Sequence, residues 1–202
     1  MKYLFLILIG MTVMSCESQT KTDLLALKLD ENVSNIVQAD QELKKDQDPN
    51  LGLHAYATNK PGNYALGGIK LSTYDFPNGN LADHNHLYLF IANKDKPNYL
   101  GFNYSSVNQA ETKSIIDYLK KTYSGYERRD SKGNGESYFW DVPTLDAWIF
   151  VYQGISNDKN DKQFFTTNFI LVKKGTRMEN STDPKVMTIK DYYTMMYPDV
   201  LK

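Results

Sequence analysis

The sequence predicts an α+β fold: a mainly antiparallel β-sheet with one clear helix packed on a face and a short C-terminal helix. Three observations lead to this prediction. Short apolar segments bounded by turn residues recur along the chain. One long segment, about residues 108–124, has apolar residues at helical spacing. The other intervals between expected strands are too short for the crossover helices that a parallel sheet requires.

The first part of the expected domain has the weakest pattern. Leucines alternate with smaller or charged residues over 25–29, which indicates a strand because side chains on a strand alternate between its faces. Asp30 is placed to be the N-cap of a following helix. The apolar stripe of that helix would consist of Val33, Ile36, Val37 and Leu43. Residues 46–50, which include Pro49, would end it.

The middle of the chain predicts consecutive strands. Asn78-Gly79 lies between two apolar segments, which is a strong signal for a hairpin. Residues 87–91 are all apolar, so we expect a central strand that is covered on both faces. Strands are expected at residues 52–68 (short, around a turn), 68–76, 86–93 and 99–104.

The best helix signal begins at Asn108. Asn108 as N-cap, with Glu111 three residues later, resembles a capping box in which asparagine replaces serine or threonine. The residues that share one helical face are Thr112, Ile115, Ile116, Leu119 and Tyr123. Gly125 provides the stop.

The remainder predicts more strands and a final helix. Strands are expected at residues 136–141, 145–153 and 164–173, with a turn at 130–135 before them. Thr188 and Asp191 would open a short helix over residues 189–197. Its residues are too apolar for a free tail, so we expect this helix to dock on the sheet.

The charge balance argues against a nucleic-acid partner. Arginine is rare, occurring only as Arg128, Arg129 and Arg177, and no Lys/Arg cluster is present. The basic surface that would hold a phosphate backbone is therefore missing from the sequence. Tyrosine is unusually common, at 15 residues, and a tyrosine ring with its hydroxyl suits sheet faces and binding surfaces alike.

The first sixteen residues read as an export signal and not as part of the fold. Lys2 precedes an unbroken apolar segment over residues 3–9, which is too short to span a bilayer as a stable helix. The export signal ends in Val13-Met14-Ser15-Cys16. Cys16 is the only cysteine of the chain, so a framework of disulfides is excluded.

This ending resembles the lipobox of bacterial lipoproteins. The resemblance implies cleavage before Cys16, a diacylglycerol on its thiol and often a further acyl chain, such as palmitate, on the new amino terminus. Removing residues 1–15 takes away one basic residue, Lys2, so the net charge changes from −1 to −2. We expect a signal peptide at 1–15, the lipidated cysteine and a tether at 16–23, and a single α+β domain at 24–202. Glutamate after the cysteine favours the outer membrane, with the periplasmic or surface face left open.

The histidines form one candidate metal site. His84 and His86 are two residues apart, with Asp83 adjacent, and His54 is the remaining histidine. Three histidines, or two and a carboxylate, would suit zinc with an open position. The alternative is that residues 82–85 are simply the polar end of a hairpin.

An aromatic group forms a candidate binding site. Alternation places Tyr138 and Trp140 on one face of their strand and Phe139 on the other, with Trp148 on the next strand. Tyr138, Trp140 and Trp148 could form an exposed platform for a sugar or a protein. The alternative is that these rings pack in the core.

The sequence contains no nucleophile elbow, phosphate loop or dinucleotide fingerprint. We therefore expect a non-enzymatic, lipid-anchored envelope protein without a cofactor, binding a protein or glycan partner, with an immunity protein against a contact toxin as one version. One alternative is a zinc-dependent hydrolase that uses His84 and His86. Another is a structural accessory subunit of an envelope complex.

Overall fold

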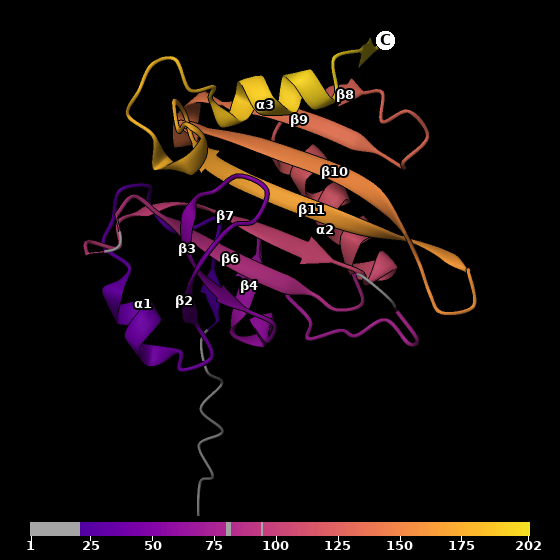
Figure 1. The fold of residues 1–202 in the computed structure, drawn as a ribbon, viewed down its shortest axis with the longest axis horizontal. Helices are drawn as coiled ribbons and strands as arrows, with labels where there is room; N and C mark the ends of the chain where they lie inside the picture. Colours follow the sequence, from indigo (N-terminus) through magenta and orange to yellow (C-terminus); the bar gives the residue numbers. More distant parts are fainter. Residues whose placement is uncertain (1–20, 80–81, 94) are drawn as a thin grey trace, which may run out of the picture.

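A nine-stranded antiparallel sheet forms the middle of the fold (Figure 1). The computed structural model describes residues 21–79, 82–93 and 95–202. Every neighbouring pair in the order β12-β8-β9-β10-β11-β7-β6-β3-β2 is antiparallel, so the predicted α+β, mainly antiparallel fold is confirmed. A second sheet, β1-β4-β5, has three short strands.

The elements have the following bounds. The strands are β1 Thr22–Asp23, β2 Lys44–Gln47, β3 His54–Thr58, β4 Tyr64–Leu66, β5 Ile69–Lys70, β6 His86–Ile91, β7 Tyr99–Ser106, β8 Glu127–Arg129, β9 Ser137–Val142, β10 Ala147–Asn157, β11 Gln163–Lys173 and β12 Val200–Leu201. The α-helices are α1 Ser34–Ala39, α2 Gln109–Thr122 and α3 Ile189–Met196, and the 3-10 helices are η1 Pro61–Asn63, η2 Pro143–Leu145 and η3 Met178–Asn180.

The large sheet is covered on both faces. On one face its side chains pack with α2, α1 and the small sheet, and on the other they pack with α3 and the segment that precedes β3. Because successive side chains of a strand point to opposite faces, each strand contributes side chains to two separate cores. Strand β6 follows the prediction for a central strand: Leu87 and Leu89 enter the first core and Phe90 enters the second.

Helix α2 begins as predicted. The side chain of Asn108 accepts a hydrogen bond from the backbone N–H of Glu111, at 3.2 Å. The Glu111 side chain does not return to the cap. It is 8% exposed and accepts hydrogen bonds from the hydroxyls of Tyr104 and Ser106, at 3.0 Å for Ser106, and from the backbone N–H of Ser72, at 2.8 Å. This buried carboxylate joins the helix to β7 and to the segment after β5.

The first part of the domain departs from the prediction. Residues 25–29 form turns and not a strand, although their leucines do pack against the core. Asp30 adopts a positive φ of 65° and does not cap a helix. Helix α1 starts later, after Val33, and ends at Ala39. The alternating pattern therefore reports burial correctly, but the backbone achieves that burial with turns.

Four short strands were not predicted. Strand β1 lies within the expected tether and pairs with β4, so the domain begins earlier than residue 24. Strand β2 lies at one edge of the large sheet and all four of its residues are exposed, so it carries no apolar pattern. Strands β8 and β12 are three and two residues long and pair with each other at the opposite edge. The expected strand over residues 68–76 shrinks to β5, which pairs with β4 and not with β6. The predicted hairpin is reduced to an isolated bridge between Asp75 and His84, on either side of the Asn78-Gly79 turn.

The export signal, Cys16 and most of the tether lie outside the described residues. Within residues 21–79, 82–93 and 95–202, we find no helix with the length and apolar character needed to cross a bilayer.

Candidate functional site: a tyrosine-lined cleft

The aromatic residues singled out from the sequence are buried. Tyr138 and Trp140 are 2% and 0% exposed and pack in the core beneath α2, while Trp148 is 9% exposed and packs in the core beneath α3. The alternation was predicted correctly. The exposed platform is wrong as a description of these three residues, because both faces of their strands are covered by helices.

The three histidines do not gather into one site. His84 and His86 have ring centroids 6.2 Å apart, and Nδ1 of His84 lies 2.7 Å from Asp83. His54 lies elsewhere, directly before Ala55 on β3. The β6 residue that pairs with Ala55 is four residues from His86, which is about 13 Å along the strand. In the part of the chain that the structure describes, no group of three or more His, Cys, Asp or Glu side chains is placed to hold a metal ion.

His86 is held by neighbours of its own. Its Nδ1 bonds to the side chain of Asn59, and its ring lies 4.3 Å from that of Tyr88. Burial, followed by the nearby His84, lowers the pKa of His86 below its ordinary value of 6.5. The ring is therefore favoured in its neutral form.

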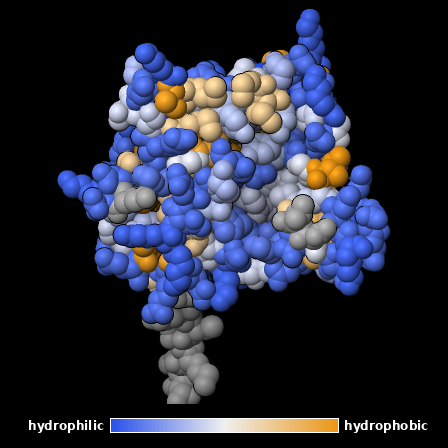
Figure 2. Space-filling model, in the orientation of Figure 1, coloured by the Kyte–Doolittle hydropathy of each residue, from blue (hydrophilic) through white to orange (hydrophobic). Residues whose placement is uncertain are grey.

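A cleft of about 240 Å³ lies between α3 and the sheet. Four tyrosines contribute to it: Tyr152 from β10, and Tyr192, Tyr193 and Tyr197 from α3 and its C-cap. The remaining lining residues are Asn50, Leu51, Phe150, Asn168, Ile170, Ile189 and Met196. In Figure 2 the upper edge of the molecule, where α3 lies, carries more hydrophobic residues than the lower part.

Local sequence places the α3 tyrosines. Thr188 and Asp191 form a reciprocal capping box that fixes the start of the helix, as predicted. The hydrogen bonds from Thr188 lower the pKa of Asp191, so the cap is ionised at neutral pH. Ile189 and Tyr193, four residues apart, point from one helical face into the core. The expectation that this helix docks on the sheet is confirmed.

The tyrosine rings form one contiguous group. The Tyr193 ring lies 4.6 Å from Phe150 and 5.1 Å from Tyr197 between centroids, and the Tyr152 ring lies 5.7 Å from Tyr197. The Tyr193 hydroxyl shares a hydrogen bond of 2.6 Å with Ser137. This hydrogen bond fixes the position of the Tyr193 ring, against which the Tyr197 ring packs.

Several polar groups of the cleft have no hydrogen-bond partner among the described residues. They are the hydroxyls of Tyr152, Tyr192 and Tyr197, the side-chain amide of Asn50, and the NH₂ group of Asn168, whose oxygen accepts from Ser105 at 2.6 Å. Burial raises the pKa of Tyr152 and Tyr197, so both hydroxyls keep their protons. These groups can donate and accept hydrogen bonds toward a bound molecule.

Asp48 shapes one wall of the cleft. Its side chain is fully buried and accepts hydrogen bonds from the backbone N–H groups of Asn50 and Leu51, at 2.9 and 2.7 Å, and from the Asn103 amide, at 2.9 Å. No cationic side chain pairs with Asp48 in the described parts of the chain. After burial, its negative charge is the next cause of the raised pKa of Tyr152. The side-chain oxygen of Asn103, Oδ1, is buried without a partner among the described residues.

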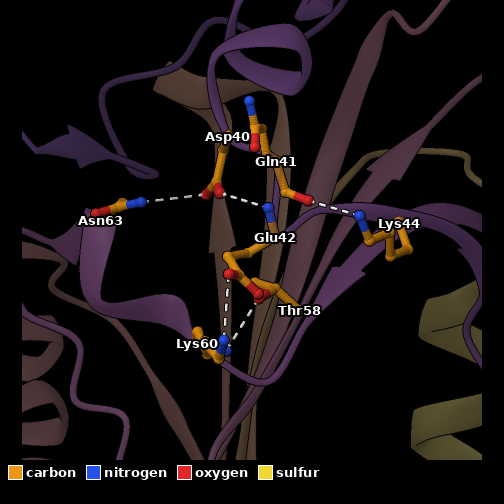
Figure 3. Close-up of polar contacts among 7 residues, drawn as sticks. All are labelled: Asp40, Gln41, Glu42, Lys44, Thr58, Lys60 and Asn63. Carbon is orange, nitrogen blue, oxygen red and sulfur yellow. Dashed lines mark hydrogen bonds and ion pairs between the residues drawn. The ribbon is translucent and has the colours of Figure 1, made fainter.

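A second hollow adjoins Asp40, at the end of α1. The Asp40 carboxylate accepts from the Tyr64 hydroxyl at 2.9 Å, from the backbone N–H of Glu42 at 3.0 Å and from the Asn63 amide at 3.5 Å. Figure 3 shows Asp40 between Asn63 and Glu42, with Lys60 reaching Glu42. The acceptor atoms of Asp40 are used within the chain, so we assign this cluster to the packing of α1 against β4.

Sequence reasoning found the helix of the cleft but not the cleft. Tyr192, Tyr193 and Tyr197 were expected to face the sheet, whereas Tyr152 and Asn168 were not distinguished from other strand residues. The high tyrosine content was the only signal for them. We found no match to this chain among protein-family models, curated proteins or solved structures.

Proposed function

We propose that this chain is a lipid-anchored protein of the bacterial cell envelope that binds a partner molecule in the tyrosine-lined cleft. The observation that carries the proposal is the lining itself, in which aromatic rings stand beside unpaired hydroxyl and amide groups. Concave sites of this kind, mostly apolar with a few converging polar groups, are typical of binding sites. The lipobox resemblance at Cys16 supplies the membrane attachment.

The position of the cleft suits an anchored binder. Residues Thr22–Asp23 pair with β4 of the small sheet, whose side chains pack on one face of the large sheet. The cleft belongs to the opposite face, with α3. Lys21 is the fifth residue after Cys16, so a lipid on Cys16 could lie at most about 18 Å from Lys21. A lipid on Cys16 would therefore attach on the side away from the cleft and leave the cleft accessible to a partner.

Binding explains the chemistry of the lining better than catalysis does. The lining residues have side chains that are aromatic, aliphatic, amide or thioether in nature. The zinc-hydrolase alternative needs His84, His86 and a third ligand in one place, and the geometry does not bring His54 to them. The described residues therefore do not bring together the ligand set that this alternative needs.

Two adjacent methionines provide a matched test. Met195 and Met196 are 59% and 52% exposed at the end of α3, but only Met196 lines the cleft. A tryptophan at position 196 would occupy cleft volume, whereas one at position 195 would add the same side chain outside it. The full-length lipidated protein and both variants would be immobilised and exposed to envelope extract. Retained protein and saccharide would then be quantified.

The proposal expects the wild-type protein and Met195→Trp to retain the same material, and Met196→Trp to lose it. Equal retention by all three proteins would contradict the cleft as the binding site. Circular dichroism and thermal unfolding of the three proteins would show that the fold is unchanged, as expected for substitutions at exposed positions.

A further inference from the structure

We infer that the cleft receives one neutral sugar ring of a glycan. This inference rests on the proposed binding function and specifies the class of ligand. Its first support is size. The cleft volume of about 240 Å³ is below the range of roughly 300–1,000 Å³ that is typical of pockets for drug-sized molecules. It therefore suits a single ring and not an extended molecule.

The second support is charge. No Lys, Arg, His, Asp or Glu side chain is among the lining residues. Burial holds the pKa of Tyr152, Tyr193 and Tyr197 above the ordinary value, so these three hydroxyls are uncharged at neutral pH. An anionic group would find no counter-charge in the lining, and it would be repelled by the buried carboxylate of Asp48, whose charge already raises the pKa of the lining residue Tyr152. Anionic sugars and phosphates are therefore disfavoured.

The third support is the pairing of rings with unsatisfied polar groups. A sugar ring has one apolar face of C–H groups and a rim of hydroxyls that both donate and accept hydrogen bonds. Tyr152 and Tyr197 offer ring surface and free hydroxyls, and Asn50 and Asn168 offer free amide groups. Rings and amides together match both parts of a sugar. An apolar peptide side chain would exclude water from these partly exposed polar groups without replacing the hydrogen bonds to that water, which is unfavourable.

A small alkylammonium ion is the main competitor, because aromatic rings and the charge of Asp48 would also attract a cation. Such a cation has no hydrogen-bonding rim, so it would leave the amides of Asn50 and Asn168 unused. The sugar accounts for more of the lining, and the cation serves as a comparison ligand in the test.

The test measures sugar binding directly. Saturation-transfer NMR and titration would use the full-length protein in a detergent without a sugar headgroup. The neutral probes would be methyl glycosides of glucose, galactose, mannose and N-acetylglucosamine, and the charged probes would be N-acetylneuraminic acid and choline. At least one neutral glycoside should bind with a dissociation constant in about the millimolar range, as expected for about a dozen ligand atoms.

The variants define where the sugar binds. Tyr152→Phe and Asn168→Ala each remove one group that can hydrogen-bond to the sugar, and each should weaken binding about five-fold. Met196→Trp should weaken it by more than about ten-fold, and Met195→Trp should leave it unchanged. Binding that is insensitive to Met196→Trp would overturn the inference.

The outcomes separate this inference from the proposed function. If no neutral glycoside binds, or if choline or N-acetylneuraminic acid binds in preference, the inference is wrong. The proposed function still stands in that case, provided that capture from envelope extract depends on Met196. If capture does not depend on Met196, the proposed function itself is wrong.

Discussion

Removing the buried carboxylate of Glu111 should destabilise the fold more than removing any exposed carboxylate of α2. In the Glu111→Ala variant, the hydroxyls of Tyr104 and Ser106 and the backbone N–H of Ser72 lose their acceptor. Hydrogen bonds to a charged group contribute about 1.5–3 kcal/mol each, and relief of the desolvated charge offsets part of their loss. We expect a net loss of about 3–4 kcal/mol in the free energy of unfolding.

This loss is measurable in two independent ways. Chemical denaturation gives the free energy of unfolding, and for a chain of this size the melting temperature should fall by roughly 10 °C. Asp117→Ala is the matched control on the same helix, because the Asp117 side chain is 58% exposed and, among the described residues, pairs with Lys113 alone. Its effect should stay within about 0.5 kcal/mol. A loss below about 1 kcal/mol for Glu111→Ala would refute the argument that this carboxylate joins α2 to the sheet.

Three further predictions concern a glycine, a histidine and the lipid anchor. Gly101→Ala should cost more than about 2 kcal/mol in urea unfolding, because Gly101 has a φ of 137° and a Cβ there would meet the backbone of β11. Gly154→Ala, with open space at the Cβ position, is its control. Burial lowers the pKa of His86 in the folded protein below its ordinary 6.5, so the unfolded chain binds more protons between these two pKa values. The free energy of unfolding should therefore be at its full value above about pH 6.5 and fall as the pH drops through that window. His86→Gln should flatten this part of the pH profile. Cys16→Ser should move the protein from the membrane fraction to the soluble fraction, and an unchanged distribution would contradict lipidation.

The elements that the sequence predicted well have strong local patterns. Helix α2 has an N-cap and an apolar face within fourteen residues, and β6 is apolar from Leu87 to Ile91. Strand β2 could not be found in this way, because an edge strand with four exposed residues owes its conformation to its partner β3. Residues 25–29 had the pattern of a strand, but periodicity reports which side chains are buried and does not fix the backbone path.

The candidate site was harder to predict because it joins distant parts of the chain. Tyr152 on β10 and Tyr197 after α3 meet at 5.7 Å, although 45 positions separate them, and Asn50 comes from near the other end of the domain. The burial of Trp140 and Trp148 was missed for a similar reason. Each strand face was predicted correctly, but only the tertiary structure shows that a helix covers each of them.

The central claim is that the cleft holds a partner in the intact envelope, and photo-crosslinking tests it most directly. A photoreactive phenylalanine derivative would replace Met196 at the cleft, or Tyr74, which is 37% exposed outside the cleft lining, in cells that produce the full-length protein. The account predicts a discrete crosslinked adduct from position 196 and none from position 74. Adducts of equal yield from both positions, or no adduct from position 196, would contradict it.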